Sequence, residues 1–517
     1  MDEIAAAATS RPDHPALITP DTTLTWAELD ARVEAAARRL VMLARPGERV
    51  AIVLGNSIDF AVTYYGVLRA GRVAVPLNPG YTCDELDYAI ADCQAAVVVA
   101  EQAARPKLRS STPPCVPPDL PGPSGDLPQV SADDLAVLLY TSGTSGRPKG
   151  AMLTRAALAA NHDQLDAIDP PVVGPDDVVL LAMPLFHAYG LNTGLGTVVH
   201  HAATGVLIDR FEPAASLSVI AERGVTVTIG VPGMYSEWSR QPSVGTAFAG
   251  VRTAVCGAAP LAPTDAAHFA ATTGKTILIG YGLTETAPVL TTTAVSERGK
   301  PGSIGRPLPG VSLRLRAVGG FGAGAPPRAG ATGGDVPWSV AADVLWEDGT
   351  ASPEEDLAEL DLAVADSDGT DPGEIVVRGA NLFSGYWPDG RDGPDAEGWW
   401  ATGDVAYADG DGDLHLVDRI GELILVNGFN VYPAEIERVL DAHPAVAESA
   451  VVAVPDDESG QKPHAYVVAA LDPAPTPAEL QVYCAGQLAR FKLPSIELVR
   501  ELPHSIIGKV RKREIAS

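Results

Sequence analysis

The sequence predicts an α/β fold, in which a large N-terminal domain of helix-covered parallel sheets precedes a small α+β domain. Helical patterns alternate with short apolar runs along the chain as far as Gly282, as expected for parallel sheets covered by helices. Several of these runs end in glycine or proline, where the carboxyl end of a strand would open into a ligand crevice. From about Gly421, strands and helices form a compact pattern of roughly 100 residues, which is the size of a separate domain.

The first long helix is predicted in the segment that begins at Thr25, because Leu29, Val33, Ala37 and Leu40 share one helical face with charges opposite. A second helix is predicted over 59–71. Buried strands are expected where apolar residues run together. These strands span 49–56, 73–79, 95–101, 177–184, 204–209, 225–232, 252–259 and 275–282.

Two segments interrupt this order. Ser110–Pro128 is too rich in proline for a helix or a sheet interior, and it is expected to be an exposed connection. The segment from about Gly319 to Asp371 is first rich in Gly, Ala and Pro and then acidic, which predicts a surface insertion, partly disordered. We therefore predict domains over 1–418, with this insertion, and over 419–517.

Further elements are predicted after the insertion. Short strands are expected over 373–379 and 412–419. In the C-terminal domain, which begins at about Gly421, we expect a first strand, then helices over 433–443 and 477–490 and strands over 448–456 and 464–470.

Composition narrows the classes of partner and compartment. The chain of 517 residues carries 37 Lys+Arg and 65 Asp+Glu, a net charge of −28, which opposes attraction to nucleic acid and anionic membranes. No segment reaches the length of a membrane span, and the N-terminus lacks the basic residues of a signal peptide. The five scattered cysteines show no metal-binding spacing and predict reduced thiols and a cytoplasmic protein.

The segment "LLYTSGTSGRPKGAML" holds the densest chemical signal. Glycines and hydroxyl residues let backbone N–H groups and side chains converge on a phosphate chain, and a lysine adds a positive charge. No Ser or Thr follows that lysine, so the segment is not a Walker loop. A flexible surface loop is the alternative interpretation. The residues concerned are Thr141, Ser142, Gly143, Thr144, Ser145, Gly146 and Lys149.

The segment resembles the phosphate loop of the adenylate-forming (AMP-binding) superfamily, which includes the acyl-CoA synthetases. The resemblance covers essentially the whole chain except the insertion and rests on motifs in the right order. They are "MPLFHAYGL", "CGAAPL", "GYGLTET", "GEIVVRG" followed by "SGYW", "WWATGD", "VDRIGELILVNGFNVYPAEIE" and "IIGKV". The resemblance implies that the large domain also contains a β-barrel-like subdomain and that the small domain is mobile.

The resemblance also implies a nucleotide site. Taken alone, Glu285 is either a solvated loop acid or a metal ligand; the resemblance implies that it holds Mg²⁺. The adenine would lie between Tyr281 and the small residues after Cys256, and Asp404 would accept hydrogen bonds from the ribose. The implied ATP/AMP-binding residues are the seven of the loop together with Gly257, Ala258, Ala259, Tyr281, Gly282, Thr284, Asp404 and Arg419.

Two further residues would act in catalysis. Lys509 would bridge the carboxylate and the α-phosphate, and His187 would line the carboxylate tunnel as a positioner and gate rather than as a base. In the family the small domain rotates between two half-reactions. The pivot would be Gly421, where many relatives carry Lys or Asp, so the control of that rotation is in question. The loop presented to the thiol would include Gly428, Phe429 and Asn430.

The resemblance implies an ATP-dependent acid–thiol ligase that forms an acyl-AMP, releases pyrophosphate and transfers the acyl group to coenzyme A. Gly230, Gly233 and Met234 would line the acyl pocket, which offers no evident charge for a second carboxylate or an amino group. A fatty acid is therefore the first choice of substrate, with an aryl acid as the second. The sequence leaves two further functions open. The chain could be a fatty acyl-AMP ligase that loads a free-standing acyl carrier protein, as the insertion suggests, or an inactive binding protein. A homodimer is left open as well.

Overall fold

The computed structural model describes residues 2–109, 113–119, 125–141, 148–317, 345–347, 350–351, 369–419, 422, 424–426, 429–456, 460–471, 473–488, 490–505 and 510–515. The chain divides into two compact units, which we call unit 1 and unit 2. Unit 1 comprises Met1–Val311 with Arg378–Trp400, and unit 2 comprises Ser312–Val377 with Ala401–Ser517. The predicted boundary between residues 418 and 419 stays a prediction.

The larger sheet of unit 1 has nine strands in the order β15-β14-β13-β12-β11-β9-β10-β1-β2. The strands from β1 through β10, β9, β11 and β12 to β13 run parallel, and β2, β14 and β15 pair antiparallel to their neighbours. The strands β9, β10, β11 and β12 are almost fully buried, as expected when helices cover both faces, whereas β13 is buried only at Ile277. The bounds are β1 Pro15–Ile18, β2 Thr23–Thr25, β9 Val178–Leu181, β10 Thr204–Leu207, β11 Val227–Gly230, β12 Thr253–Cys256, β13 Ile277–Gly282, β14 Val289–Thr292 and β15 Arg306–Pro307.

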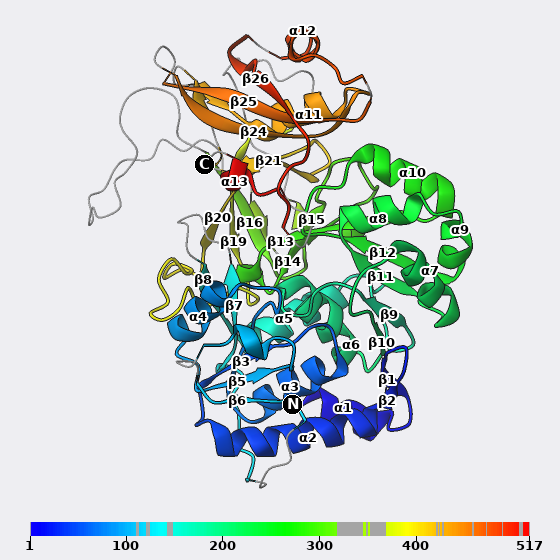
Figure 1. The fold of residues 1–517 in the computed structure, drawn as a ribbon, viewed down its shortest axis with the longest axis vertical. Coiled ribbons are helices and arrows are strands. Elements are labelled where there is room, and N and C mark those ends of the chain that lie inside the picture. Colours follow the sequence, from blue (N-terminus) through cyan, green and yellow to red (C-terminus); the bar gives the residue numbers. More distant parts are fainter. Residues whose placement is uncertain are drawn as a thin grey trace. The chain divides into compact units, whose positions relative to one another are not determined.

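The second sheet of unit 1 has six strands in the order β6-β5-β3-β4-β7-β8. It is parallel except for the final pair, β7 and β8, which form an antiparallel hairpin. Figure 1 shows these strands beside the helices α2, α3 and α4. The bounds are β3 Arg49–Val53, β4 Val73–Pro76, β5 Val97–Ala100, β6 Cys115–Val116, β7 Leu135–Thr141 and β8 Lys149–Thr154.

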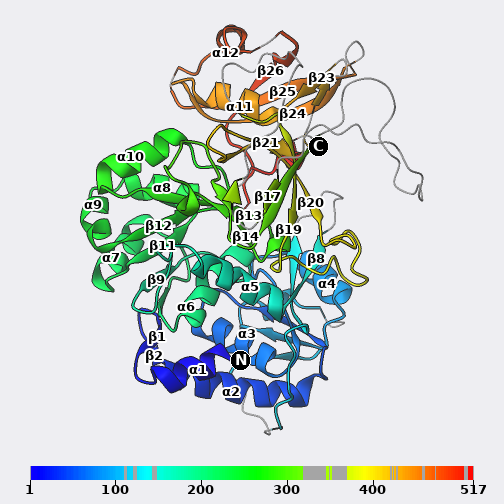
Figure 2. The same ribbon diagram turned by 180° about the vertical axis from the view of Figure 1, so that it is seen from behind.

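Several helices of unit 1 begin at a residue whose side chain caps the helix. In α2, the Thr25 side chain accepts from the backbone of Glu28, whose carboxylate accepts from the backbone of Thr25, which forms a capping box. Figure 2 shows α1 and α2 beside β1 and β2. The helices are α1 Glu3–Ser10, α2 Trp26–Leu43, α3 Ile58–Arg69, α4 Cys83–Asp92, α5 Arg155–Asp166, α6 Thr197–His200, α7 Pro213–Glu222, α8 Pro232–Ser239, α9 Val244–Ala247 and α10 Pro263–Thr273.

Short helical turns connect several of these elements. The segment η2 (Tyr189–Gly196) is a π-helix that leads into α6, and the others are 3₁₀ turns. A π-helix is rare and frequently marks a functional region. The 3₁₀ turns are η1 Arg105–Lys107, η3 Phe248–Gly250, η4 Thr284–Thr286 and η5 Thr293–Val295.

A cluster of aromatic rings joins the helices beside β11–β13. Tyr235, Trp238, Phe248 and Phe269 meet edge to face with ring centroids 5.1–5.3 Å apart, and all four are buried. Each such pair contributes about 0.5–1.5 kcal/mol beyond the burial of its area. The cluster therefore gives rigid support to the strands whose ends carry the predicted adenine contacts.

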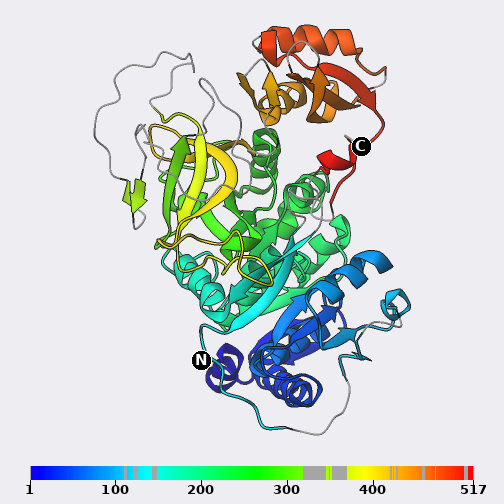
Figure 3. The ribbon, with the colours of Figure 1, turned by 90° about the vertical axis from the view of Figure 1, so that its left-hand side faces the viewer.

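Unit 2 contains two sheets. The six-stranded sheet runs β18-β17-β16-β19-β20-β21. The β-barrel-like subdomain that the resemblance implies stays a prediction. The C-terminal sheet runs β23-β22-β25-β24, with β26 parallel to β25, and the helices α11 and α12 lie beside it (Figure 3). The bounds are β16 Ser312–Ala317, β17 Leu345–Glu347, β18 Thr350–Ala351, β19 Gly373–Arg378, β20 Trp400–Ala408, β21 Leu414–Arg419, β22 Ile424–Val426, β23 Phe429–Val431, β24 Val446–Asp456, β25 Gly460–Ala469 and β26 Ser495–Val499, with α11 Pro433–Asp441, α12 Pro477–Ala485, η7 Arg490–Lys492 and α13 Lys512–Ile515.

The predicted helices and strands are found close to their predicted bounds, and the predicted α/β fold class is confirmed. Several elements were not predicted, among them the strands β8, β14 and β26 and the helices α1, α4, α5, α7, α8 and α10. Among the described residues of Ser110–Pro128, the two-residue strand β6 lies at the edge of its sheet, as expected for a segment excluded from a sheet interior. Of the predicted insertion, only β17, β18 and residues 369–371 are described. The five cysteines are free thiols, and no helix among the described residues is long and apolar enough to cross a membrane.

Candidate active site

The predicted phosphate loop joins two strands of a hairpin in unit 1. Thr141 at the end of β7 lies opposite Lys149 at the start of β8 in the antiparallel register. The predicted contacts Ser142, Gly143, Thr144, Ser145 and Gly146 fall between them and lie outside the described residues. The hairpin therefore fixes where this segment leaves the sheet and where Lys149 returns to it.

The segment after Phe383 lies along β8 and completes the surroundings of Lys149. The Ser384 N–H donates to Met152 O, and the Trp387 N–H donates to Gly150 O. This pairing places the Tyr386 ring 4.9 Å from Lys149 Nζ, which also forms an ion pair of 3.0 Å with Asp392.

Tyr386 also reaches the predicted magnesium ligand. Its hydroxyl donates to Glu285 Oε1 at 2.6 Å, while the Phe383 N–H donates to Glu285 O at 2.9 Å. Glu285 is 6% exposed, so its charge is held in a largely dry environment. Tyr386 thus links Lys149 to Glu285. Tyr386 stands in the motif "SGYW", and the sequence alone had given this tyrosine no role.

The surroundings of Glu285 fit a magnesium ion. Mg²⁺ prefers hard oxygen ligands and is commonly bound by one or two carboxylates together with substrate phosphates. Glu285 supplies a carboxylate, and the neighbouring Thr284 supplies a hydroxyl group at the start of η4. The carboxylate and the hydroxyl group leave the other coordination positions of the magnesium ion to phosphate oxygens and water.

The predicted adenine contacts gather at one edge of the larger sheet. Parallel β11, β12 and β13 are in register at Gly230, Cys256 and Ile279, so the residues that follow each strand emerge together. Gly257, Ala258 and Ala259 follow β12, and Ala258 adopts a left-handed φ of 67°. Such an edge is where open α/β sheets bind ligands.

Tyr281 and Gly282 end β13 at the same edge. A Cβ on Gly282 would lie 1.7 Å from the carbonyl oxygen of Pro288, so only glycine fits there. Gly282 thereby holds the turn that leads into Thr284 and Glu285.

His187 lies after β9 and is half-buried. Burial lowers its pKa to about 4, so the imidazole is neutral at physiological pH. Its Nδ1 accepts from the Tyr189 N–H at 3.3 Å, which leaves the proton on Nε2. A neutral ring of fixed tautomer is consistent with the predicted role of His187 as a positioner.

Tyr189 is a second residue that sequence reasoning missed. It is 6% exposed, and among the described residues its hydroxyl has no hydrogen-bond partner. A Cβ on Gly257 would lie 3.2 Å from this hydroxyl, which places the ring beside the end of β12. The sequence contained a signal for this residue, because Tyr189 follows His187 by two residues in the motif "MPLFHAYGL".

The predicted acyl-pocket residues are only partly brought together. A Cβ on Gly230 would lie 3.4 Å from the Met234 methyl group, and Met234 is buried. A Cβ on Gly233, in α8, would meet no heavy atom of the described chain within 4 Å. Gly230 and Met234 are therefore neighbours, while Gly233 faces open space.

The predicted ribose contacts belong to unit 2 and are paired with each other. Asp404 in β20 lies opposite Arg419 in β21, and Arg419 Nε is 2.7 Å from Asp404 Oδ1. Asp404 is 4% exposed. Lys509, Gly421 and Gly428 lie outside the described residues, as do the side chains of Phe429 and Asn430 in β23.

Comparison with known proteins decides the family. Residues 4–320 match the profile of the AMP-binding enzymes, and residues 435–509 match the C-terminal domain of AMP-binding enzymes. The chain belongs to the AMP-binding enzyme family. The predictions of an AMP-forming acyl- or aryl-CoA ligase and of ATP, Mg²⁺ and coenzyme A as its cofactors are confirmed at the level of the family.

Relatives and solved structures cover nearly the whole chain. A feruloyl-CoA synthase from Amycolatopsis is 36% identical over 96% of this chain and 94% of its own length. A long-chain-fatty-acid–CoA ligase from Yersinia pestis is 31% identical over 97% and 91%. ATP-bound MatB from Rhodopseudomonas palustris has a TM-score of 0.83 at 31% identity, covering 99% of this chain and 98% of its own. The o-succinylbenzoate CoA synthetase of Bacillus subtilis, bound to ATP and magnesium, has a TM-score of 0.79 at 26% identity over 100% and 99%.

Proposed function

We propose that this ligase activates a hydroxylated aromatic carboxylic acid as its acyl-AMP and transfers the acyl group to coenzyme A. The observation that carries this proposal is the buried Tyr189 hydroxyl, which has no partner among the described residues and lies beside Gly257. An unpaired buried polar group costs about 1–3 kcal/mol. A hydroxyl group on an aromatic substrate would supply the missing hydrogen bond, whereas an aliphatic chain would not.

In the first half-reaction a carboxylate oxygen attacks the α-phosphorus of ATP, and the bond to pyrophosphate breaks. This step needs mainly positioning and charge neutralisation. Lys149 can supply positive charge for this step. Its ion pair with Asp392 is partly exposed, and such pairs contribute only about 0–1 kcal/mol. Lys149 can therefore exchange Asp392 for a phosphate oxygen at little cost.

Glu285 would hold the magnesium ion, which when bound neutralises charge on the phosphates and the departing pyrophosphate. The carboxylate must keep one orientation to do so. The hydrogen bond of 2.6 Å from Tyr386 restrains one carboxylate oxygen, and the Phe383 N–H restrains the backbone at the same residue. Tyr386 is therefore a positioning residue for the metal ligand.

The second half-reaction transfers the acyl group. The thiolate sulfur of coenzyme A attacks the acyl carbon, and the bond to AMP breaks. His187, neutral because burial lowers its pKa to about 4, would line the path of the acyl group without taking a proton. Lys509 would neutralise charge during adenylation, and Asp404 and Arg419 would contact the ribose.

A fatty acid is the second candidate substrate. Buried Met234 beside Gly230 provides an apolar wall, and several long-chain-fatty-acid–CoA ligases are 28–31% identical to this chain. The sequence alone favoured a fatty acid. The buried hydroxyl group of Tyr189 favours the hydroxylated aromatic acid instead. An acyl carrier protein remains the second candidate acceptor.

Matched acids test the proposal. Pyrophosphate release is measured for 4-hydroxycinnamate, cinnamate and a long-chain fatty acid with wild-type protein and Tyr189→Phe. We expect the wild type to prefer the hydroxylated acid by about tenfold, as one hydrogen bond allows, and Tyr189→Phe to lose that preference while keeping its rate on cinnamate. A preference for the fatty acid, or one unchanged in Tyr189→Phe, would refute the proposal. Parallel reactions with coenzyme A identify the acceptor, because AMP ester that accumulates without thioester would favour a carrier protein.

A further inference from the structure

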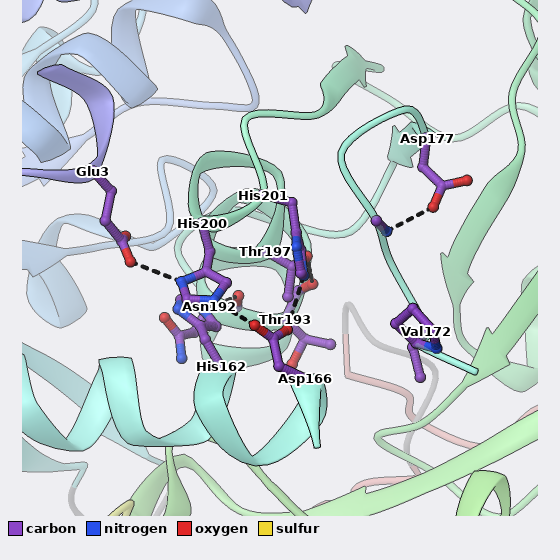
Figure 4. Close-up of polar contacts among 12 residues, drawn as sticks. Glu3, His162, Asp166, Val172, Asp177, Asn192, Thr193, Thr197, His200 and His201 are labelled. Atoms are coloured by element: carbon purple, nitrogen blue, oxygen red, sulfur yellow. Dashed lines mark hydrogen bonds and ion pairs between the residues drawn. The ribbon is translucent and has the colours of Figure 1, made fainter. Parts of the chain in front are cut away.

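A second polar cluster lies in unit 1 and has no part in the reaction described above. Glu3 begins α1, His162 and Asp166 lie one turn apart on α5, and His200 ends α6, with His201 directly after it. Figure 4 shows these side chains pointing toward one another from the three helices. Carboxylates and imidazoles gathered in this way are the ligand types that bind transition metals.

His162 offers an unused ring nitrogen to this cluster. It is 4% exposed, and its Nε2 lies 3.0 Å from Asn192 O in the π-helix η2. When Nε2–H donates to that carbonyl, Nδ1 carries a lone pair. Nδ1 is buried and has no hydrogen-bond partner among the described residues. A backbone carbonyl that fixes the second ring nitrogen is typical of a metal-binding histidine.

His200 is oriented in the same manner. Its Nε2 lies 2.9 Å from Asp166 Oδ2, and its Nδ1 lies 2.8 Å from Glu3 Oε1. Asp166 would accept from Nε2–H, which leaves Nδ1 to a metal and forms a carboxylate–histidine–metal triad. In the metal-free protein a proton takes the metal's place, and hydrogen bonding to Glu3 and Asp166 raises the pKa of His200 to about 9.

The ligand atoms are close enough for one ion. Glu3, His162 and His200 each offer one ligand atom, and these atoms lie within 4.8 Å of one another. Bonds of about 2.0–2.1 Å in a tetrahedral zinc site place ligand atoms about 3.3 Å apart. Small side-chain rotations would therefore close the site. The Glu3 side chain is 40% exposed, which gives an ion a path from solvent.

We propose that Glu3, His162 and His200 bind one Zn²⁺ ion, with water as the fourth ligand, and that the ion ties α1 to α5 and α6. Two imidazoles and one carboxylate suit zinc, whereas Mg²⁺ prefers oxygen ligands alone. Because His162 also holds Asn192 O, the ion restrains η2, the segment that begins at Tyr189.

A second grouping shares one of these histidines. Asp166, His200 and His201 also offer ligand atoms within 4.8 Å of one another. Asp166 is already paired with both histidines, at 2.9 and 3.0 Å. The grouping with His162 is favoured because it contains the buried nitrogen that lacks a partner among the described residues.

Zinc titration of the full-length, untagged protein tests the proposal. The protein is stripped with a chelator and titrated with Zn²⁺ near neutral pH in competition with a chromophoric chelator, and Co²⁺ is substituted to read coordination from its visible spectrum. We expect one Zn²⁺ per chain, a four-coordinate Co²⁺ spectrum and a rise in Tm of several degrees. Millimolar Mg²⁺ should not compete.

Four variants identify the ligands. His162→Ala and Glu3→Gln should weaken zinc binding about tenfold or more, and His201→Ala and the exposed control His268→Ala should change it by less than about twofold. If His162→Ala does not fold, Glu3→Gln still tests the proposal, because a substitution at the half-exposed Glu3 should not prevent folding. Absence of saturable zinc binding by the wild type would overturn the proposal, as would a loss in His201→Ala equal to that in Glu3→Gln.

Discussion

At the residue scale, the contact between Tyr386 and Glu285 is the most direct test of the candidate site. Tyr386→Phe removes the donor 2.6 Å from the carboxylate and leaves the ring beside Lys149 in place. One lost hydrogen bond to a charged group costs about 1.5–3 kcal/mol, so kcat/KM should fall about tenfold to a hundredfold. The Mg²⁺ concentration for half-maximal rate should also rise, which a magnesium titration of pyrophosphate release measures.

Tyr140→Phe is the matched control for this variant. The Tyr140 hydroxyl also donates to a carboxylate at 2.6 Å, that of Asp92, which is not a predicted ligand of the magnesium ion. It should lower stability without changing the magnesium requirement. An equal magnesium shift in both variants would show that Tyr386 acts through general stability and not through Glu285.

His187 gives a prediction about pH. Burial lowers its pKa from the usual 6.5 to about 4, so it binds no proton in the folded enzyme between pH 6 and 8. His187→Asn should therefore lower kcat/KM without changing the shape of its pH profile in that range. A fall in the kcat/KM of the wild type near pH 6.5 that is absent in His187→Asn would contradict the role of His187 as a neutral positioning residue.

The same shift affects stability. Below pH 6.5 the unfolded chain binds a proton at His187 that the folded chain does not, so the free energy of unfolding falls as the pH falls from 6.5 to about 4. His187→Asn should remove this contribution to acid sensitivity. Denaturant unfolding at a series of pH values measures it.

At the element scale, β13 carries the turn that positions Glu285. Gly282→Ala would place a Cβ 1.7 Å from Pro288 O, while Gly280→Ala, two residues earlier in the same strand, meets nothing within 4 Å. We expect Gly282→Ala to lose about 1–3 kcal/mol of stability and most of its activity, because the turn must shift. Thermal unfolding and pyrophosphate release of both variants test this expectation. Similar behaviour of the two variants would contradict it.

At the scale of the whole molecule, the C-terminal segment has a hydrophobic core of its own. Ile424, Val431, Ile436 and Leu440 pack with Leu480 in a buried cluster whose members all lie beyond Arg419. The boundary near residue 419 stays a prediction, which a shortened chain can test. A shortened chain ending at Arg419 would keep all of β21 and the pair between Arg419 and Asp404.

We expect this shortened chain to fold and to bind ATP, but to release no pyrophosphate, because it lacks Lys509. Calorimetric titration with ATP and a pyrophosphate assay would measure the two properties. Full-length Lys509→Ala is the matched control and should behave alike. Adenylate formation by the shortened chain would refute the role of Lys509, and failure to fold would refute the predicted boundary.

The order of elements and the family could be read from the sequence because they depend on local signals. The spacing of Leu29, Val33, Ala37 and Leu40 predicts a helix, and these residues are buried on α2 as expected. Apolar runs followed by glycine likewise predicted β11, β12 and β13. The phosphate loop, with its glycines and lysine, and the predicted ligand Glu285 stand in motifs that are visible without any structure.

Tertiary structure alone decided which side chains meet. Tyr386 lies about a hundred residues from Glu285 along the chain, and only the pairing of the segment after Phe383 with β8 brings the two together. Similarly, α1, α5 and α6 are distant in sequence, and their packing joins Glu3 to His162 and His200. Periodicity reports which face of an element is buried, but a contact between distant segments depends on packing. For this reason the sequence determined the fold and the chemistry class, and the structure decided the residues that support them.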